Sequence, residues 1–261
     1  MPIQFHKRPG LVAYITCGDP DVETTIAVIL AAVEAGADVI ELGVPFSDPV
    51  ADGPVIQAAS ERALAAGTGV KDVLAVAREV RRHTDVGLIV FSYMNPLLRY
   101  GLERFCADAS SAGVDGVLVT DLPVEEAGPY LCAMAKYKLD PVFLAAPMSP
   151  DARLKLIADH SRGFVYAVSR TGVTGTRQEV AGDARELVTR LRKHTKLPIA
   201  VGFGVSNAEQ FAEVGRFADA VVVGSAIMQR VFDNPGNEAE AVKAFVRGLT
   251  SAMKPAAARR G

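Results

Sequence analysis

Tryptophan is absent from this chain, cysteine is rare, and neither sign of charge is in clear excess. The three cysteines stand at unrelated spacings, which favours reduced core thiols in a cytoplasmic protein over a disulfide framework or a zinc site. They are Cys17, Cys106 and Cys132. A formal net charge of -2 offers no basic surplus that would draw the chain to nucleic acid or to an anionic membrane.

Long apolar runs are also missing. None approaches the length of a transmembrane helix, and the first ten residues, MPIQFHKRPG, lack the apolar region of a secretory signal. We therefore expect neither a membrane span nor export. Hydrophobic residues still make up 49% of the 261, which is enough for a sizeable buried core. The basic ending from Lys254 is typical of a frayed tail.

Short apolar segments alternate with longer amphipathic ones along the chain. The short segments are almost continuously apolar, as strands buried on both faces should be. The predicted strands are Leu11–Cys17, Asp38–Gly43, Gly87–Ser92, Gly116–Thr120, Pro141–Ala145, Gly163–Val168, Pro198–Gly202 and Ala220–Gly224. Helical patterns between them include Val22–Ala35, Gly101–Ala112, Val124–Lys138, Pro150–His160, Val180–His194, Asn207–Val214 and Asn237–Ala252.

Eight strand-then-helix units predict a (β/α)8 barrel. Similar sequences recur where a helix joins the next strand: Gly-Ala-Asp-Val-Ile, Gly-Val-Asp-Gly-Val and Phe-Ala-Asp-Ala-Val. Each supplies a turn residue, an acid and then a new strand, which indicates repeated architecture. No linker or shift in composition divides the chain, so we expect one domain over residues 1–261. A doubly wound open sheet is the alternative fold.

The loops after the last two predicted strands suggest a phosphate site. Barrels commonly bind phosphate there, where glycines let backbone N–H groups approach the anion. Gly204, Gly224 and Ser225 occupy these positions, and Gly172 and Gly175 after the sixth strand suggest a lid. The alternative is that these glycines only make tight turns.

The sequence lacks the residues that several kinds of barrel chemistry would need. A Schiff base needs a lysine at the barrel mouth, but every lysine falls in a predicted helix, a joint at the opposite end or a terminus. The four histidines lie at helix ends or near the N-terminus and form no metal constellation. No glycine-rich dinucleotide fingerprint follows the first strand, which disfavours hydride transfer. Carboxylate chemistry remains.

Glu41 is the acid that stands out, because it lies near the carboxyl end of an apolar strand. On either face of a barrel strand a carboxylate is largely desolvated, which raises its pKa and needs a reason. General acid–base catalysis is one reason; a hydrogen bond to Tyr14 or Thr16 is the structural alternative. Asp48 and Asp52 follow in a loop where Asp usually forms turns.

At this point specific motifs appear. The stretch ELGVPFSDPVADGPVIQAA closely resembles the signature of the tryptophan synthase alpha subunit family. So do the stretches beginning at Tyr14, Asp121, Ser169, Val201 and Gly224, which occur in the family's order and span nearly the whole chain. The resemblance implies a (β/α)8 barrel that cleaves indole-3-glycerol phosphate into indole and glyceraldehyde 3-phosphate. It implies no cofactor in this chain.

The resemblance also implies roles for individual residues. Glu41 and Asp52 become the two catalytic acids: Glu41 shuttles protons, and Asp52 accepts a hydrogen bond from the indole N–H. The substrate pocket maps onto Tyr14, Ile56, Phe91, Leu118, Tyr166, Thr174 and Phe203, and the phosphate site onto Gly175, Gly204, Gly224 and Ser225. For any one of the apolar or aromatic positions alone, barrel core is the alternative.

The implied partner is a beta subunit that uses pyridoxal phosphate, in an αββα tetramer. Asp48, Asn95-Pro96 and Asp121-Leu-Pro would face it. Two departures from the family pattern bear on the interpretation. The segment before the first strand is short, which puts the stability of the barrel bottom in doubt. Tyr14 and Cys17 are not the family's commonest choices, and Cys17 is either a small core residue or a reactive thiol.

Three other functions stay open. The chain could be a free-standing lyase of the same family, or a catalytically silent barrel that only activates a beta subunit. A more distant alternative is an isomerase or epimerase of another phosphosugar.

Overall fold

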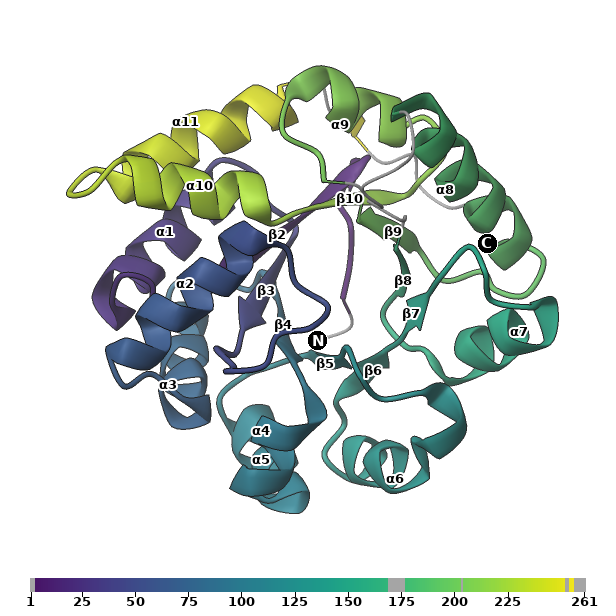
Figure 1. Ribbon diagram of the computed structural model, residues 1–261, viewed down its shortest axis with the longest axis horizontal. Coiled ribbons are helices and arrows are strands. Elements are labelled where there is room, and N and C mark those ends of the chain that lie inside the picture. Colours follow the sequence, from purple (N-terminus) through teal and green to yellow (C-terminus); the bar gives the residue numbers. More distant parts are fainter. Residues whose placement is uncertain (1–2, 169–176, 203, 252–253, 256–261) are drawn as a thin grey trace.

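Nine parallel strands form one sheet in the computed structural model, which describes residues 3–168, 177–202, 204–251 and 254–255. In chain order they are β2 (Gly10–Thr16), β3 (Val39–Gly43), β4 (Gly87–Ser92), β5 (Gly116–Val119), β6 (Asp140–Val142), β7 (Leu144–Ala145), β8 (Val165–Val168), β9 (Ile199–Gly202) and β10 (Ala220–Val223). The spatial order is β6-β5-β4-β3-β2-β10-β9-β8-β7. Because only Phe143 separates β6 from β7 in the chain, the sheet closes into an eight-stranded barrel (Figure 1). The predicted barrel is confirmed; the fifth strand, predicted as continuous, is interrupted.

Helices surround the barrel as an outer ring (Figure 1). They are α1 (Val22–Glu34), α2 (Pro54–Ala65), α3 (Val70–Arg81), α4 (Met94–Tyr100), α5 (Leu102–Ser111), α6 (Gly128–Lys136), α7 (Asp151–His160), α8 (Arg177–Leu191), α9 (Ala208–Val214), α10 (Ser225–Asp233) and α11 (Glu238–Thr250). The single helix predicted over Val124–Lys138 is instead a 3₁₀ turn, η1 (Val124–Glu126), followed by α6. Pro129 explains the break, because proline lacks an N–H and fits the first turn of a new helix.

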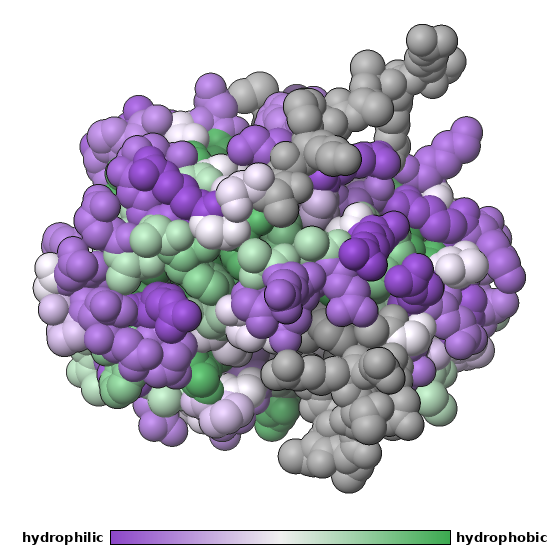
Figure 2. All heavy atoms as spheres, turned by 90° about the horizontal axis from the view of Figure 1, so that it is seen from above, coloured by the Kyte–Doolittle hydropathy of each residue, from purple (hydrophilic) through white to green (hydrophobic). Residues whose placement is uncertain are grey.

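The face of the molecule shown in Figure 2 is mostly hydrophilic, with smaller apolar patches between the hydrophilic side chains. Among the described residues, no helix is long and apolar enough to cross a membrane. Cys17 and Cys106 are buried free thiols, whereas Cys132 is exposed, so the prediction of three core thiols is wrong for Cys132.

Alternate residues of the strands point into the barrel and, with Ile3 and Phe164, form an apolar interior cluster. The cluster comprises Ile3, Val12, Val39, Ile89, Leu118, Val142, Phe164, Ala200, Ala220 and Val222. Glu41 is two residues beyond Val39 on β3, so strand alternation places it on the same inner face, towards the carboxyl ends of the strands.

The opposite end of the barrel is closed by Ile3 and Phe5, which we call the N-terminal plug. Ile3 is only 6% exposed and belongs to the interior cluster, and the Phe5 ring packs edge-on against Phe164 at 5.8 Å. A Cβ added at Gly163 would lie 2.7 Å from Ile3, and one at Gly10 2.4 Å from Phe5. The short segment before β2 therefore fills the bottom of the barrel, whose stability the sequence alone puts in doubt.

The recurring joint motifs have a structural role. In each, the aspartate just before a strand exchanges hydrogen bonds with the adjacent strand. The backbone N–H of the aspartate donates to the carbonyl of one residue on that strand. The aspartate side chain accepts a hydrogen bond from the backbone N–H of that same partner residue. The three pairs are Asp38 with Leu11, Asp115 with Leu88 and Asp219 with Ile199, and all six N–O distances are 2.9–3.0 Å. These joint aspartates fix strand register at the bottom of the barrel.

Candidate active site

A cavity of about 290 Å³ opens at the carboxyl ends of the strands. Nine of the residues predicted to form the site line it: Tyr14, Glu41, Asp52, Ile56, Phe91, Tyr166, Gly204, Gly224 and Ser225. They come from loops and strands far apart in the sequence, and the barrel brings them together. Thr174, Gly175 and Phe203, also predicted, lie outside the described residues, as does Gly172 of the predicted lid.

Leu118 is the one described exception among the predicted site residues. It is fully buried in the interior cluster and does not line the cavity. Thr120, two residues further along the chain and just past the end of β5, forms that part of the wall instead. The reason is depth: a position two residues earlier on a barrel strand lies one layer below the mouth.

Glu41 is fully buried, and neither of its carboxylate oxygens has a hydrogen-bond partner among the described residues. Burial raises the pKa of Glu41 from its ordinary 4.5 to about 8. The structural alternative, a bond to Tyr14 or Thr16, is not found, because the Thr16 hydroxyl donates to the Tyr14 oxygen instead. An acid that is buried, has a pKa close to neutral pH and faces a cavity is suited to give and take protons.

Asp52 lies in the loop between β3 and α2, just ahead of the helix start at Pro54. Burial raises its pKa from 3.8 to about 6, and a hydrogen bond from the Tyr93 hydroxyl partly offsets this. That bond spans 3.1 Å to Asp52 Oδ2. The Gln57 side chain donates to the Asp52 carbonyl at 2.8 Å, so the first turn of α2 also holds the loop.

Tyr93 was not singled out in the sequence, where it is one residue of the loop after the third strand. It is 2% exposed, and its hydroxyl accepts the Ala51 N–H at 2.9 Å while donating to Asp52. Its ring also packs against Phe46, with centroids 5.1 Å apart. Tyr93 thus fixes both the loop and the carboxylate that the loop carries. No local signal marks it, because only the fold places it against Asp52.

The glycines of the proposed phosphate site lie on one side of the cavity. Gly204 has a φ of +64°, which favours glycine, and Gly224 caps the first turn of α10. Ser225 begins that nine-residue helix, whose free N–H groups and dipole favour an anion. This end of the cavity can therefore accept a phosphate without a basic side chain.

The other walls are apolar and aromatic. Tyr14 and Phe91 form an edge-to-face pair with centroids 5.0 Å apart, and Ile56, Leu144 and Tyr166 complete a surface suited to a flat ring. Cys17 is fully buried, and burial raises the pKa of its thiol far above the ordinary range. It therefore behaves as a small core residue and not as a reactive thiol.

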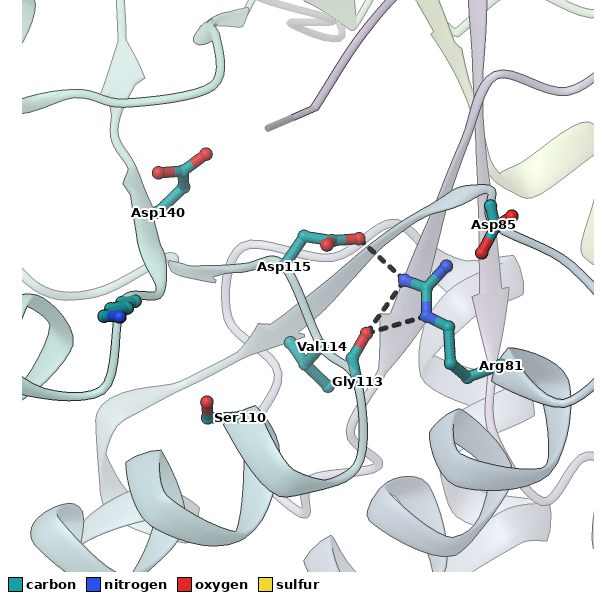
Figure 3. Close-up of a pocket in the computed structure, with 8 residues that line it drawn as sticks. Arg81, Asp85, Ser110, Gly113, Val114, Asp115 and Asp140 are labelled. Carbon is teal, nitrogen blue, oxygen red and sulfur yellow. Dashed lines mark hydrogen bonds and ion pairs between the residues drawn. The ribbon is translucent and has the colours of Figure 1, made fainter. Parts of the chain in front are cut away.

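A larger cavity of about 540 Å³ lies at the opposite end of the barrel (Figure 3). Its one guanidinium, Arg81, is fully engaged. It donates to the carbonyls of Gly113, Thr84 and Val86 and to the Asp115 carboxylate. No group of three or more His, Cys, Asp or Glu among the described residues could hold a metal ion. The mouth cavity is therefore the better candidate for a reaction.

Comparisons with known proteins agree with this geometry. The family model described as tryptophan synthase alpha chain matches residues 3–257. The tryptophan synthase alpha chain of Solibacter usitatus is 51% identical over 97% of this chain and 94% of its own length, and that of Geobacter sulfurreducens is 50% identical over 87% and 86%.

Solved structures are similar as well. The tryptophan synthase A-subunit of Pyrococcus furiosus superposes with a TM-score of 0.88 at 40% identity, covering 95% of this chain and 100% of that one. A Mycobacterium tuberculosis tryptophan synthase chain gives a TM-score of 0.86 at 39% identity, covering 94% and 92%. The chain belongs to the tryptophan synthase alpha chain family.

Proposed function

We propose that Glu41 and Asp52 carry the alpha reaction of tryptophan synthase in this chain. That reaction is the retro-aldol cleavage of indole-3-glycerol phosphate to indole and glyceraldehyde 3-phosphate, a lyase step in tryptophan biosynthesis. The observation that carries the proposal is the unpaired, fully buried carboxyl group of Glu41, which faces a cavity shared with Asp52. Burying such a group costs stability, and catalysis accounts for it.

The chemistry needs two proton transfers. Cleavage of the C–C bond requires a proton at C3 of the indole and the loss of a proton from the glycerol hydroxyl that becomes the aldehyde. With a pKa of about 8, Glu41 exists in both protonation states near neutral pH and can serve both transfers. No net proton is consumed, because the one delivered to carbon matches the one removed from oxygen.

Asp52 supplies charge stabilisation. Protonation at C3 places positive charge on the indole nitrogen. The hydrogen bond from the indole N–H to the Asp52 carboxylate is therefore stronger in the transition state than in the ground state. A pKa of about 6 leaves Asp52 ionised at neutral pH, and the Tyr93 hydroxyl holds its carboxylate in place.

The remaining binding roles follow the walls of the cavity. Tyr14, Ile56, Phe91 and Tyr166 enclose the indole ring, and Gly204, Gly224 and Ser225 bind the phosphate at the start of α10. Leu118 supports this pocket from the layer below. The roles of Thr174, Gly175 and Phe203 stay predictions.

As an alpha subunit the chain works with a beta subunit, and pyridoxal phosphate belongs to that partner. Asp48, Asn95 and Asp121 remain the predicted contacts. Two apolar side chains in the same part of the chain, Val50 at 85% and Leu98 at 56% exposed, support an interface at the mouth. We place the enzyme in the cytoplasm, and the single domain over residues 1–261 stays a prediction.

One assay tests the proposal. Indole release from indole-3-glycerol phosphate is followed with and without a beta subunit, for the native chain, Glu41→Gln and Asp52→Asn. We expect the native chain to release indole, and we expect both substitutions to abolish or greatly reduce that release. Unchanged cleavage by Glu41→Gln would remove the assigned acid, and rapid turnover without a beta subunit would identify a free-standing lyase. A native chain inactive on this substrate but active on another phosphosugar would overturn the function.

A further inference from the structure

Tyr14 is more than an apolar wall of the pocket. It lies on β2 directly beside Glu41 of β3, since the two residues are register partners in the parallel sheet. Both point into the barrel, as strand alternation from Val12 and Val39 requires. The phenol of Tyr14 and the carboxyl group of Glu41 therefore reach the same cavity from neighbouring strands.

The position of the hydroxyl is fixed by a glycine. A Cβ added at Gly43 would lie 2.3 Å from the Tyr14 hydroxyl oxygen and 2.6 Å from the ring carbon that bears it. Gly43 is two residues beyond Glu41 on the same strand face. The hydroxyl thus occupies the space next to Glu41 that any side chain at residue 43 would fill.

The hydrogen bonding of this hydroxyl is incomplete. The Thr16 hydroxyl, itself fully buried, donates to the Tyr14 oxygen at 3.4 Å. Among the residues that the structure describes, no acceptor takes the proton of Tyr14 itself. Tyr14 is only 4% exposed, and the part of it that is accessible lines the mouth cavity. A buried donor without an acceptor is costly, and a bound molecule can satisfy it.

The surrounding charges keep this donor protonated. Burial raises the pKa of Tyr14 well above its ordinary value, and the negative charge of Asp52 raises it further. The Thr16 hydrogen bond works in the opposite direction but does not reverse the shift. Tyr14 is consequently a permanent hydrogen-bond donor in the cavity that the two acids share, and it does not exchange protons itself.

We infer that the Tyr14 hydroxyl donates a hydrogen bond to the substrate oxygen that Glu41 deprotonates. This inference rests on the proposed function. As Glu41 takes the proton from that alcohol, negative charge builds on the oxygen before the C–C bond breaks, and a fixed donor there stabilises the transition state more than the ground state. The Tyr14 proton stays on the phenol throughout, so the proton balance of the reaction is unchanged.

The test removes the hydroxyl from the enzyme and, separately, from the ligand. Tyr14→Phe keeps the ring and its contact with Phe91. Indole-3-propanol phosphate keeps the indole and the phosphate but lacks both hydroxyls of the chain. We expect Tyr14→Phe to lower kcat about tenfold with little change in KM, the signature of an interaction made in the transition state. Inhibition by indole-3-propanol phosphate should be equal in both enzymes.

Tyr130→Phe is the matched control. Tyr130 is also buried, but its hydroxyl donates to the Val117 carbonyl at 2.8 Å, outside the cavity. The Tyr130→Phe variant should lose some thermal stability and keep the native kcat. A kcat of Tyr14→Phe within twofold of the native value overturns the inference and leaves the proposed function intact. Weaker inhibition of Tyr14→Phe by the dehydroxylated analogue also overturns it, because the effect would then come from packing. Absence of indole release by the native chain with a beta subunit overturns the proposed function and the inference together.

Discussion

The joint aspartates at the bottom of the barrel and Glu41 at its mouth are carboxyl groups in opposite settings. At the bottom, Asp38, Asp115 and Asp219 each accept hydrogen bonds from backbone N–H groups, and Asp115 and Asp219 also pair with arginines. At the mouth, Glu41 is buried more deeply than any of them and accepts no hydrogen bond among the described residues. Bonded acids stabilise the register of the strands, whereas an unbonded one lowers stability and is available for chemistry.

The same contrast appears in the glycines. At the bottom, Gly10 and Gly163 leave room for the N-terminal plug, which fills the barrel. At the mouth, Gly43 leaves room for the Tyr14 hydroxyl and Gly202 for that of Tyr166, next to a cavity that stays open. The barrel therefore spends small residues on packing at one end and on placing polar groups at the other.

Glu41→Gln tests the mouth and has the largest expected effect. Glutamine fills the same space but cannot exchange a proton, so kcat should fall by roughly 10²–10⁴-fold. Stability should stay the same or rise, because an unpaired ionisable group is removed from a buried site. Steady-state indole release and urea unfolding near neutral pH measure the two. A loss of activity that follows a loss of folded protein would contradict the assignment.

The pH dependence of stability sharpens the contrast further. The folded-state pKa of Glu41, about 8, lies above its ordinary 4.5, so the folded chain holds this proton more tightly than the unfolded chain does. The resulting contribution is fully present below about pH 4.5 and is lost as pH rises towards about 8. Urea unfolding across this window should show the stability of the native chain falling relative to Glu41→Gln. Parallel curves for the two proteins would show that Glu41 titrates normally.

Asp38→Ala tests the bottom, with an effect of the opposite kind. The Asp38 carboxylate accepts the N–H groups of His6 and Leu11, and its loss leaves both without that acceptor. We expect a cost of about 1–3 kcal/mol in the free energy of unfolding and a kcat close to native. Asp38→Asn, which keeps one acceptor oxygen, is the control and should cost less. A fall in kcat without destabilisation would mean that the bottom also serves catalysis.

The sequence predicts those features of the two ends of the barrel that depend on local residue patterns. The alternation of short apolar segments with longer amphipathic ones, together with the recurring Gly-Ala-Asp type of joint, predicts the barrel. Glu41 was flagged because an acid in an apolar strand is costly. Asp52 was different: in its Ser-Asp-Pro-Gly setting it looked like a turn former, and only the family resemblance gave it a role.

What the sequence did not predict depends on contacts between distant residues. The plug residue Ile3 meets Gly163, and Tyr93 meets Asp52, only after the barrel closes. Leu118, which the family resemblance assigns to the substrate pocket, lies in the interior cluster and does not line the cavity. Phe143 interrupts the fifth strand at a point where the apolar pattern continues unbroken.

Tyr93→Phe has the smallest expected effect on activity among the mouth substitutions and tests whether the mouth depends on its supporting contacts. It removes the hydrogen bond to Asp52 and the acceptor of the Ala51 N–H. Since that bond holds the pKa of Asp52 down, the pKa should rise above about 6 and the acid limb of the kcat/KM profile should move to higher pH. Near neutral pH the loss of kcat/KM should be only a few-fold, roughly 1 kcal/mol or less.

Tyr100→Phe is the matched control, because the Tyr100 hydroxyl also donates to an aspartate, Asp108, at 2.7 Å but away from the cavity. If both variants kept the native pH profile, Asp52 would be held by the loop backbone alone, and the mouth would resemble the bottom in relying on main-chain hydrogen bonds.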